Sequence, residues 1–287
     1  MLRYLFILFS FTNTVLGESL YLQDPWGFYV TNPEPNPNIS HVTNDSRRVH
    51  KGEDVAEGEY PFVIVIAGLT KTEVYRIATG SVITPRWTLT SAHVFTHMGV
   101  HDKDTFVVWY DKFTESPLVT NMYSHITEIV KHPGFRDTPF KNFQSFYSKN
   151  DICLLKVHEI YLKTYGKLSP VDRSTLIGLS AMFFGAGATV KEGKDMFRPI
   201  QVGHGMITKC GHPITSWSPF LLCVAPPCSD REHTPHTGDS GGPFMVDGKI
   251  IGTFSLRYFA YTAKLWVAFN PVDLYIDWIH DVTNRMD

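Results

Sequence analysis

The chain has 287 residues, 43% hydrophobic and 19% charged, which is enough apolar mass for a large buried core and excludes an intrinsically disordered chain. Its 26 Lys and Arg residues against 28 Asp and Glu residues give a net charge of −2, so no electrostatic reason exists to expect a nucleic acid or an anionic membrane as partner. Four cysteines are too few for a small disulfide scaffold, and no internal apolar run reaches the roughly 18 residues of a membrane span.

The first 17 residues predict a secretory signal peptide rather than part of the fold. Arg3 carries a positive charge, residues 5–11 form a short apolar stretch, and small or compatible residues precede a cleavage site after Gly17. The alternatives are a buried N-terminal strand or a membrane anchor, but the apolar stretch is too short to span a bilayer. We therefore expect a secreted, extracellular protein, in which disulfides are permitted.

Residues 18–48 differ in composition from the rest of the chain and predict an extended linker or pro-segment. The Pro-rich stretch within them cannot keep a helix. In a secreted chain, the sequons at Asn38 and Asn44 become candidate glycosylation sites. The segment ends in Arg47-Arg48, a dibasic pair on an exposed stretch where proteolytic nicking is expected, although a solvated charge pair in a loop is the alternative.

From Tyr60 onward, short runs of β-branched and aromatic residues separated by Gly, Pro, Asn and Asp predict strands. Six runs in each half, with no strong helix between them, indicate an all-β fold of two antiparallel barrels or sandwiches. One helix is predicted from about Val272, where Tyr275, Ile276 and Ile279 recur at helical spacing. The predicted strands span 62–69, 73–83, 87–90, 106–110, 125–131, 151–157, 182–188, 200–208, 220–225, 243–246, 250–256 and 265–269.

The strongest chemical signal is the run Thr-Gly-Asp-Ser-Gly-Gly-Pro over residues 237–243. Three glycines around Ser240 make a tightly turning backbone that exposes the serine hydroxyl and leaves nearby N–H groups free to face a developing oxyanion. A plain Gly-rich turn between strands is the alternative.

A serine hydroxyl is a poor nucleophile near neutral pH and needs a base. Among 13 histidines, His93 is distinguished by its place after an apolar strand and a small-residue turn. A buried carboxylate orients an imidazole best, and Asp151 opens an otherwise apolar strand, where a charge is costly unless it is paired. A core histidine and a strand-start turn residue are the alternatives.

These three segments, in the order His93, Asp151, Ser240, resemble the chymotrypsin-like serine peptidase family, over about residues 49–287. The gaps between them suit that family. The resemblance implies an all-β fold of two antiparallel six-stranded β-barrels with a C-terminal α-helix and an active site between the barrels. Further matching segments are Glu59-Tyr60-Pro61-Phe62, Gly80-Ser81-Val82-Ile83 and Asp277-Trp278-Ile279.

The resemblance also implies the catalytic roles. Ser240 would be the nucleophile and His93 its general base, while Asp151 would orient the imidazole. The N–H groups of Gly238 and Ser240 would form the oxyanion hole, and Ser255 lies where the family places a serine beside the triad aspartate. This chemistry needs no metal and no organic cofactor. Its substrates would be polypeptides, with protein inhibitors as candidate partners.

The same resemblance implies a role for the dibasic pair Arg47-Arg48. Family precursors are cut before an apolar residue, and the new amino group pairs with the aspartate that precedes the nucleophile. Here an activating protease would cut after Arg48, and the Val49 amine would pair with Asp239 to order the loop at Gly238. The chain would then comprise a signal peptide (1–17), a pro-segment (18–48) and a peptidase domain (49–287).

The cysteines depart from the family's pattern. The resemblance favours a Cys210–Cys223 disulfide, makes Cys153 a buried, unpaired strand residue, and leaves Cys228 either free or paired with another chain. Three other family bridges are absent with both partners replaced, which leaves no orphan thiol. The replaced pairs are Ala78 with Val94, Ala181 with Val246, and His236 with about Ala260.

The expected specificity pocket is also atypical. Thr234 stands at the pocket floor, where trypsin-like members have an aspartate, so a preference for Arg or Lys is not expected. Arg257 replaces one of two glycines in the pocket wall, and Lys264 falls near the other. The two basic side chains would either block large residues or attract an acidic one, unless both extend into solvent.

Two hypotheses of different classes remain. The first is a secreted serine endopeptidase made as a zymogen, with a Ser-His-Asp triad and non-tryptic specificity. The second is a non-catalytic peptidase homologue that acts as a secreted binding or regulatory protein. The usual sign of the second class is a replaced triad residue, and here all three are present.

Overall fold

The computed structural model describes residues 49–96, 106–139, 146–187, 196–212, 214–225, 233–259 and 265–285. All of them belong to one compact unit, Ser40–Asp287. The predicted signal peptide and pro-segment lie outside the described residues, together with Arg48, Asn38, Asn44, Cys228 and Lys264. Within the described ranges, no helix is long and apolar enough to cross a membrane.

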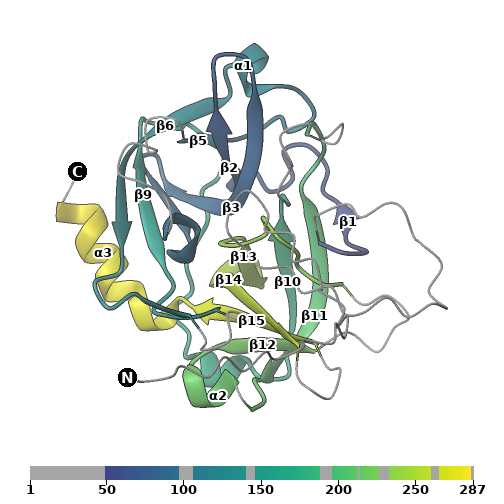
Figure 1. Ribbon diagram of the computed structural model, residues 1–287, viewed down its shortest axis with the longest axis vertical. Helices are drawn as coiled ribbons and strands as arrows, with labels where there is room; N and C mark the ends of the chain where they lie inside the picture. The colour runs from purple at the N-terminus through teal and green to yellow at the C-terminus, as the bar shows by residue number, and fades with distance from the viewer. Residues whose placement is uncertain are drawn as a thin grey trace, which may run out of the picture. The chain divides into compact units, whose positions relative to one another are not determined.

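Six strands of the first half close into an antiparallel barrel, as predicted (Figure 1). In order around the barrel they are β2 (Val63–Leu69), β3 (Val74–Thr84), β4 (Trp87–Thr90), β9 (Cys153–Val157), β6 (Tyr123–Lys131) and β5 (Phe106–Trp109). They form because their sequences are rich in β-branched and aliphatic residues, and the six residues Val63 to Gly68 of β2 are all buried. β4 pairs with β9 so that Thr90 lies opposite Cys153.

The second half closes a second six-stranded antiparallel barrel, which confirms the predicted fold class. The pairing of β11 with β12 closes the ring, and β1 (Glu53–Asp54), which the sequence did not predict, pairs with β11. β13 and β14 are joined by Asp247-Gly248, both with positive φ, as two-residue hairpin turns favour. In ring order the strands are β11 (Gln201–Lys209), β10 (Ser180–Gly185), β13 (Pro243–Val246), β14 (Lys249–Phe259), β15 (Leu265–Pro271) and β12 (Leu222–Ala225).

A two-stranded hairpin, β7 (Arg136–Pro139) with β8 (Phe146–Lys149), lies between β6 and Asp151 and was not predicted. Its first strand contains Arg, Asp, Thr and Pro, which lack the alternation typical of strands. The predicted C-terminal helix is confirmed: a 3-10 turn, η4 (Asp273–Tyr275), leads into α3 (Ile276–Arg285). The other short helices are η1 (His93–Phe95), α1 (Pro117–Thr120), η3 (Arg173–Leu176) and α2 (Ile214–Trp217).

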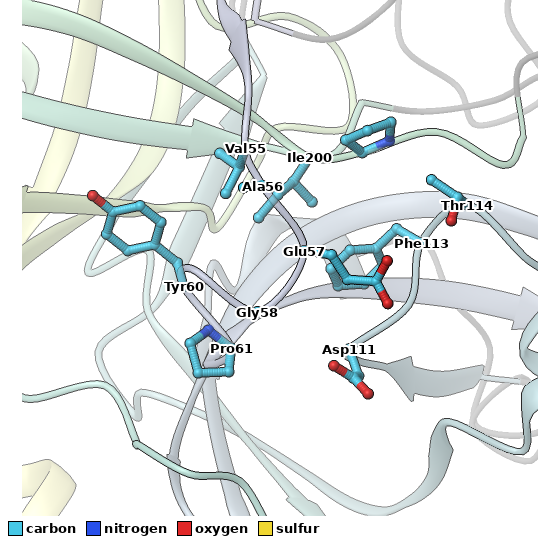
Figure 2. Close-up of a pocket in the computed structure, with 11 residues that line it drawn as sticks. Val55, Ala56, Glu57, Gly58, Tyr60, Pro61, Asp111, Phe113, Thr114 and Ile200 are labelled. Carbon is cyan, nitrogen blue, oxygen red and sulfur yellow. The ribbon is translucent and has the colours of Figure 1, made fainter.

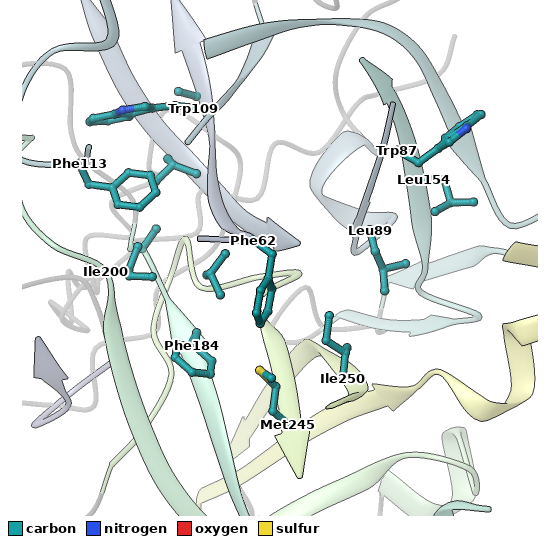
Figure 3. Packing of buried hydrophobic residues seen from close by; sticks show 14 of the residues in the cluster. Phe62, Trp87, Leu89, Trp109, Phe113, Leu154, Phe184, Ile200, Met245 and Ile250 are labelled. Carbon is teal, nitrogen blue, oxygen red and sulfur yellow. The ribbon is translucent and has the colours of Figure 1, made fainter. Parts of the chain in front are cut away.

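One apolar cluster joins the two barrels (Figure 3). Leu89 and Leu154 contribute to it from the first barrel, and Phe184, Met245 and Ile250 from the second. Apolar burial stabilises a fold by about 25 cal/mol per Å². The shared cluster therefore holds the barrels against each other, so that loops from both can build one site.

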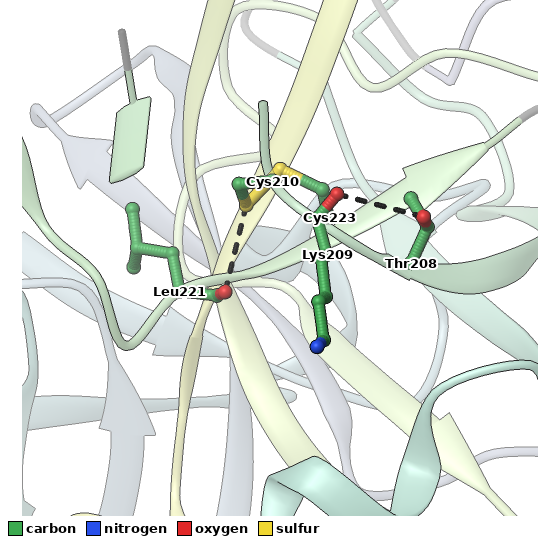
Figure 4. Close-up of a disulfide and its surroundings, with 5 residues drawn as sticks. All are labelled: Thr208, Lys209, Cys210, Leu221 and Cys223. Atoms are coloured by element: carbon green, nitrogen blue, oxygen red, sulfur yellow. Dashed lines mark hydrogen bonds between the residues drawn. A yellow bond between two sulfur atoms is a disulfide. The ribbon is translucent and has the colours of Figure 1, made fainter. Parts of the chain in front are cut away.

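The disulfide Cys210–Cys223 is present, which confirms the predicted pairing (Figure 4). It links the end of β11 to β12, with Cα atoms 5.0 Å apart and 13 residues of sequence separation. Closing a loop of about this length stabilises a fold by about 3 kcal/mol in the chain-entropy model. Cys153 is buried and unpaired, as predicted, and burial raises the pKa of its thiol, which keeps it uncharged and unreactive.

The residues that replace two absent bridges pack in the barrel cores. Ala78 is fully buried in a cluster of the first barrel, and Val94 packs against the same cluster. Ala181 and Val246 both lie in a cluster of the second barrel. Apolar contacts therefore occupy the positions where the family pattern expects those disulfides.

Candidate active site

His93 and Asp151 are brought together by the pairing of β4 with β9. His93 follows the end of β4, and Asp151 lies two residues before the start of β9. His93 Nδ1 lies 2.7 Å from Asp151 Oδ2, and the backbone N–H of His93 donates to Asp151 Oδ1 at 2.8 Å. Both carboxylate oxygens are thus engaged, which fixes the plane of the imidazole.

Ser240 approaches the same histidine from the second barrel. Its Oγ lies 2.9 Å from His93 Nε2, although the two residues are 147 positions apart. Gly238 and Gly241 on either side have φ of 88° and 79°, a region that favours glycine. A Cβ on Gly241 would also lie 2.0 Å from Thr90 Oγ1, so this loop approaches β4 too closely for any side chain there.

The charges of this group are strongly coupled. Burial alone would lower the pKa of His93, but the charge and hydrogen bond of Asp151 outweigh burial and raise that pKa above its usual value. Burial alone would raise the pKa of Asp151, but His93 and the Ser255 hydroxyl keep it low. Ser255 Oγ donates to Asp151 Oδ2 at 2.5 Å. The arrangement can therefore hold a proton on the imidazole without neutralising the carboxylate.

Asp239, immediately before Ser240, is fully buried. It accepts hydrogen bonds from the backbone N–H groups of His236 (2.7 Å) and Gly187 (2.8 Å). Burial raises the pKa of Asp239 to about 7, against the opposing effect of these hydrogen bonds and of the charges of Arg198 and Arg257. Burial of this carboxyl therefore outweighs the combined effect of its hydrogen bonds and of both arginine charges on its pKa.

Val49 lies in the core of the second barrel, only 1% exposed and packed in the cluster that contains Phe183 and Phe244. The next residue, His50, exchanges two backbone hydrogen bonds with Thr234, at 2.7 and 3.3 Å. These hydrogen bonds hold His50 beside Thr234, the expected floor of the specificity pocket.

Two residues expected to line a specificity pocket, Thr234 and Arg257, lie in the described part of the chain. Thr234 is buried, and Arg257 on β14 is half-buried with its Nε atom shielded from solvent. The charge of Arg257 contributes to lowering the pKa of the buried Asp239, against the larger effect of burial.

Two residues near the site were missed by sequence reasoning. Asp137 on β7 accepts a hydrogen bond from Ser148 Oγ at 3.1 Å, and its charge adds to the rise in the pKa of His93. A signal for it lay in the long polar segment before Asp151. Thr79 on β3 contacts Gly238, 159 residues away, and no local pattern connects residues so distant in sequence.

A separate hollow lies away from these residues (Figure 2). Apolar residues such as Val55, Phe113 and Ile200 line it, with the carboxylates of Glu57 and Asp111 beside them. None of the candidate site residues takes part. In the described ranges, no group of three or more His, Cys, Asp or Glu side chains is placed to hold a metal ion.

Two six-stranded barrels and a Ser-His-Asp cluster between them define the class of chymotrypsin-like serine peptidases. The family model described as Trypsin matches residues 49–279, and the chain therefore belongs to the trypsin family, as its sequence motifs predicted.

Three curated proteins illustrate the relationship. Chymotrypsin-like elastase family member 1 of Macaca fascicularis is 24% identical over 262 residues, 84% of this chain and 92% of the relative. Chymotrypsin-C of Bos taurus is 23% identical over 254 residues, 83% of this chain and 89% of the relative. The venom peptide isomerase heavy chain of Agelenopsis aperta is 25% identical over 218 residues, 70% of this chain and 84% of the relative.

Proposed function

We propose that the chain is a secreted serine endopeptidase, made as a zymogen, that hydrolyses peptide bonds with non-tryptic specificity. The observation that carries the proposal is the continuous chain of hydrogen bonds from Asp151 through His93 to Ser240. Its two relatives named as an elastase family member and a chymotrypsin support the same reaction class.

In the first half of the reaction, Ser240 Oγ attacks the carbonyl carbon of the scissile bond while His93 Nε2 takes its proton. The tetrahedral intermediate collapses, His93 returns the proton to the leaving amine, and the acyl group remains on Ser240. In the second half, His93 takes a proton from water, the resulting hydroxide attacks the acyl carbon, and the proton returns to Ser240. Asp151 keeps Nδ1 protonated throughout and stabilises the imidazolium.

The oxyanion that forms in each half needs hydrogen-bond donors already in place. We assign this role to the backbone N–H groups of Gly238 and Ser240. Donors of this kind are effective because they are aimed before the charge develops, in a site with little water. The positive φ of Gly238 supports this assignment, since it lets the backbone turn back on itself around the nucleophile.

The high pKa of Asp239 supports a zymogen mechanism. Cleavage after Arg48 by an activating protease would create an amine at Val49, whose side chain already lies in the core of the second barrel. Pairing that amine with Asp239 would place a positive charge beside the buried carboxyl and order the loop around Ser240. The chain would then consist of a signal peptide 1–17, a pro-segment 18–48 with candidate glycans on Asn38 and Asn44, and a peptidase domain 49–287.

Substrate choice would depend on Thr234 and Arg257. A substrate Arg or Lys would find only a hydroxyl at the pocket floor and would be repelled by Arg257, as it would by Lys264. Small apolar residues, or Asp and Glu, would be preferred before the cut bond. The enzyme would need no metal or organic cofactor, and its partners would be polypeptide substrates and protein inhibitors.

A fluorophosphonate probe tests the proposal directly, because it labels only an activated serine. The secreted protein cut after Arg48 should be labelled at Ser240 and should cleave a mixed peptide library. Ser240→Ala should be secreted and folded but lose both properties, with turnover reduced by several orders of magnitude. An unlabelled, inactive wild-type protein would instead support the non-catalytic homologue.

A further inference from the structure

Thr79 on β3 of the first barrel contacts the nucleophile loop of the second barrel. Its backbone N–H donates to the carbonyl oxygen of Ser240 at 2.9 Å. Its Oγ1 donates to the carbonyl oxygen of Gly238, also at 2.9 Å. Thr79 thus donates hydrogen bonds to the carbonyl oxygens of both Gly238 and Ser240, the two residues whose N–H groups we assign to the oxyanion hole.

The same hydroxyl has a second partner. It accepts a hydrogen bond from the backbone N–H of Ala186 at 2.9 Å. Because an amide N–H can only donate and a carbonyl oxygen can only accept, the single proton of the Thr79 hydroxyl must point at Gly238. The direction of this hydrogen bond is therefore determined by its surroundings.

Ala186 is itself held in place. Arg76, three residues before Thr79 on β3, is fully buried and donates from Nη1 to the Ala186 carbonyl oxygen at 3.0 Å. The next residue, Gly187, donates its N–H to Asp239. The carbonyl oxygen of Thr79 accepts from Thr90 Oγ1 at 2.9 Å, on the strand that leads to His93. All polar groups of Thr79 are thus engaged with segments that build the site.

A residue that restrains the nucleophile loop is useful because the loop is rich in glycine. Gly238 and Gly241 have wide conformational freedom, so the loop can adopt other conformations at little cost. Thr79 is 0% exposed, so water does not compete for its hydrogen bonds. We propose that the Thr79 hydroxyl is a positioning element that holds Gly238 in the conformation in which its N–H group and that of Ser240 form the oxyanion hole. This inference rests on the proposed peptidase function.

Thr79→Val tests the inference, because valine keeps the shape of the side chain and removes only the hydroxyl. The hydrogen bond from the Thr79 backbone to Ser240 remains. We expect kcat to fall about 10- to 100-fold, somewhat less than when an oxyanion donor is removed outright. KM should stay nearly constant, because bound substrate before the attack carries no oxyanion. Affinity for a peptide aldehyde, which forms a tetrahedral adduct, should fall with kcat/KM.

Two further variants separate positioning from general stability. Thr79→Ser restores the hydroxyl and should recover most of kcat. Thr88→Val is the matched control, because Thr88 on β4 is also a fully buried threonine and its hydroxyl has no hydrogen-bond partner in the described part of the chain. This control should keep kcat unchanged. An equal loss of kcat in both valine variants, or no rescue by serine, would overturn the inference.

Hydrogen exchange of the amides at 237–242 gives a readout that does not depend on turnover. Amide exchange should be faster in Thr79→Val than in the wild type and unchanged in Thr88→Val.

If the wild type cleaves peptides but Thr79→Val matches it in kcat and in exchange rate, the inferred role of the Thr79 hydroxyl is wrong and the proposed function stands. If the wild type is inactive, the proposed function fails. In that case, an exchange rate in Thr79→Val equal to that of the wild type would independently overturn the positioning role of Thr79. If Thr79→Val does not fold, Thr79→Ala removes the same hydroxyl without a branched side chain, and the same criteria apply.

Discussion

The two barrels contribute to the candidate active site in different ways. The first supplies His93 and Asp151, which lie beside each other because the backbones of β4 and β9 are paired. The second supplies Ser240 from a loop with two positive-φ glycines and a buried carboxyl at Asp239. One half of the site is built on strand pairing, and the other on a loop.

This difference indicates where control can be exerted. A strand pair is held by many backbone hydrogen bonds and changes little when one charge changes. The loop before Ser240 contains Asp239, whose pKa burial raises to about 7, so we expect a positive charge brought beside it to stabilise the loop. We therefore expect activation and substrate choice to depend on the second barrel, whereas His93 and Asp151 are already paired in the first.

Removing the carboxylate of the first barrel should have the largest effect. Asp151→Asn should lower kcat about 10⁴-fold while the protein stays folded, because an amide no longer selects the correct tautomer of His93. The base must be neutral to act, so wild-type kcat/KM should fall as the pH drops through the pKa of His93, which the charge and hydrogen bond of Asp151 raise above its usual value against the effect of burial. Residual activity of Asp151→Asn should show this fall at lower pH, because the charge that raised the pKa is gone.

The control is Asp137→Asn, which removes the weaker of the two charges acting on His93. It should shift the pH profile slightly downward and leave kcat at high pH intact. A loss in Asp137→Asn as large as that in Asp151→Asn would mean that strand pairing does not determine which carboxylate orients the base.

Blocking activation should have the next largest effect. Arg48→Gln should be secreted but remain uncut, with activity about 10²- to 10³-fold below that of the cut wild type, the loss expected for a missing oxyanion donor. Peptide hydrolysis and N-terminal sequencing after treatment with the activating protease measure the result. Arg47→Gln is the matched control, since it keeps a basic residue directly before Val49.

Equal activity of cut wild type and uncut Arg48→Gln would contradict the inference that activation depends on the Asp239 loop of the second barrel. It would mean that contacts from the first barrel, such as those of Thr79, order the nucleophile loop without a new amine.

Changing the pocket should have the smallest effect. Arg257→Gly should raise kcat/KM for a peptide with Phe before the cut bond about 10-fold relative to Ala, because the wall recedes. The substitution should also weaken any preference for Glu before the cut bond.

The control is Arg257→Gln, which keeps most of the length of the side chain but removes its charge. It separates the effect of side-chain size from that of charge. The measurement compares matched peptides ending in Arg, Phe, Ala and Glu, and a dominant wild-type preference for Arg would overturn the proposed role of the pocket.

Much of the architecture was predictable because it rests on local patterns. The strands follow from runs of β-branched and apolar residues, and the helix at Ile276–Arg285 follows from helical spacing. The Cys210–Cys223 bridge followed from resemblance to the family, and its cysteines are only 13 positions apart. The hairpin β7–β8 was missed because its first strand is polar and contains a proline.

The family and the three residues expected to act together can be read from motifs, namely the run around Ser240 and the order of His93, Asp151 and Ser240. How these residues are held depends on contacts that form only in the folded chain. The hydrogen bond from Thr79 to Gly238 joins segments that are 159 residues apart. The burial of Asp239 and the effect of the Arg257 charge on its pKa likewise arise only from packing. Sequence patterns report the periodicity and chemistry of neighbours along the chain, whereas hydrogen bonds and desolvation depend on which segments the folded barrels bring together.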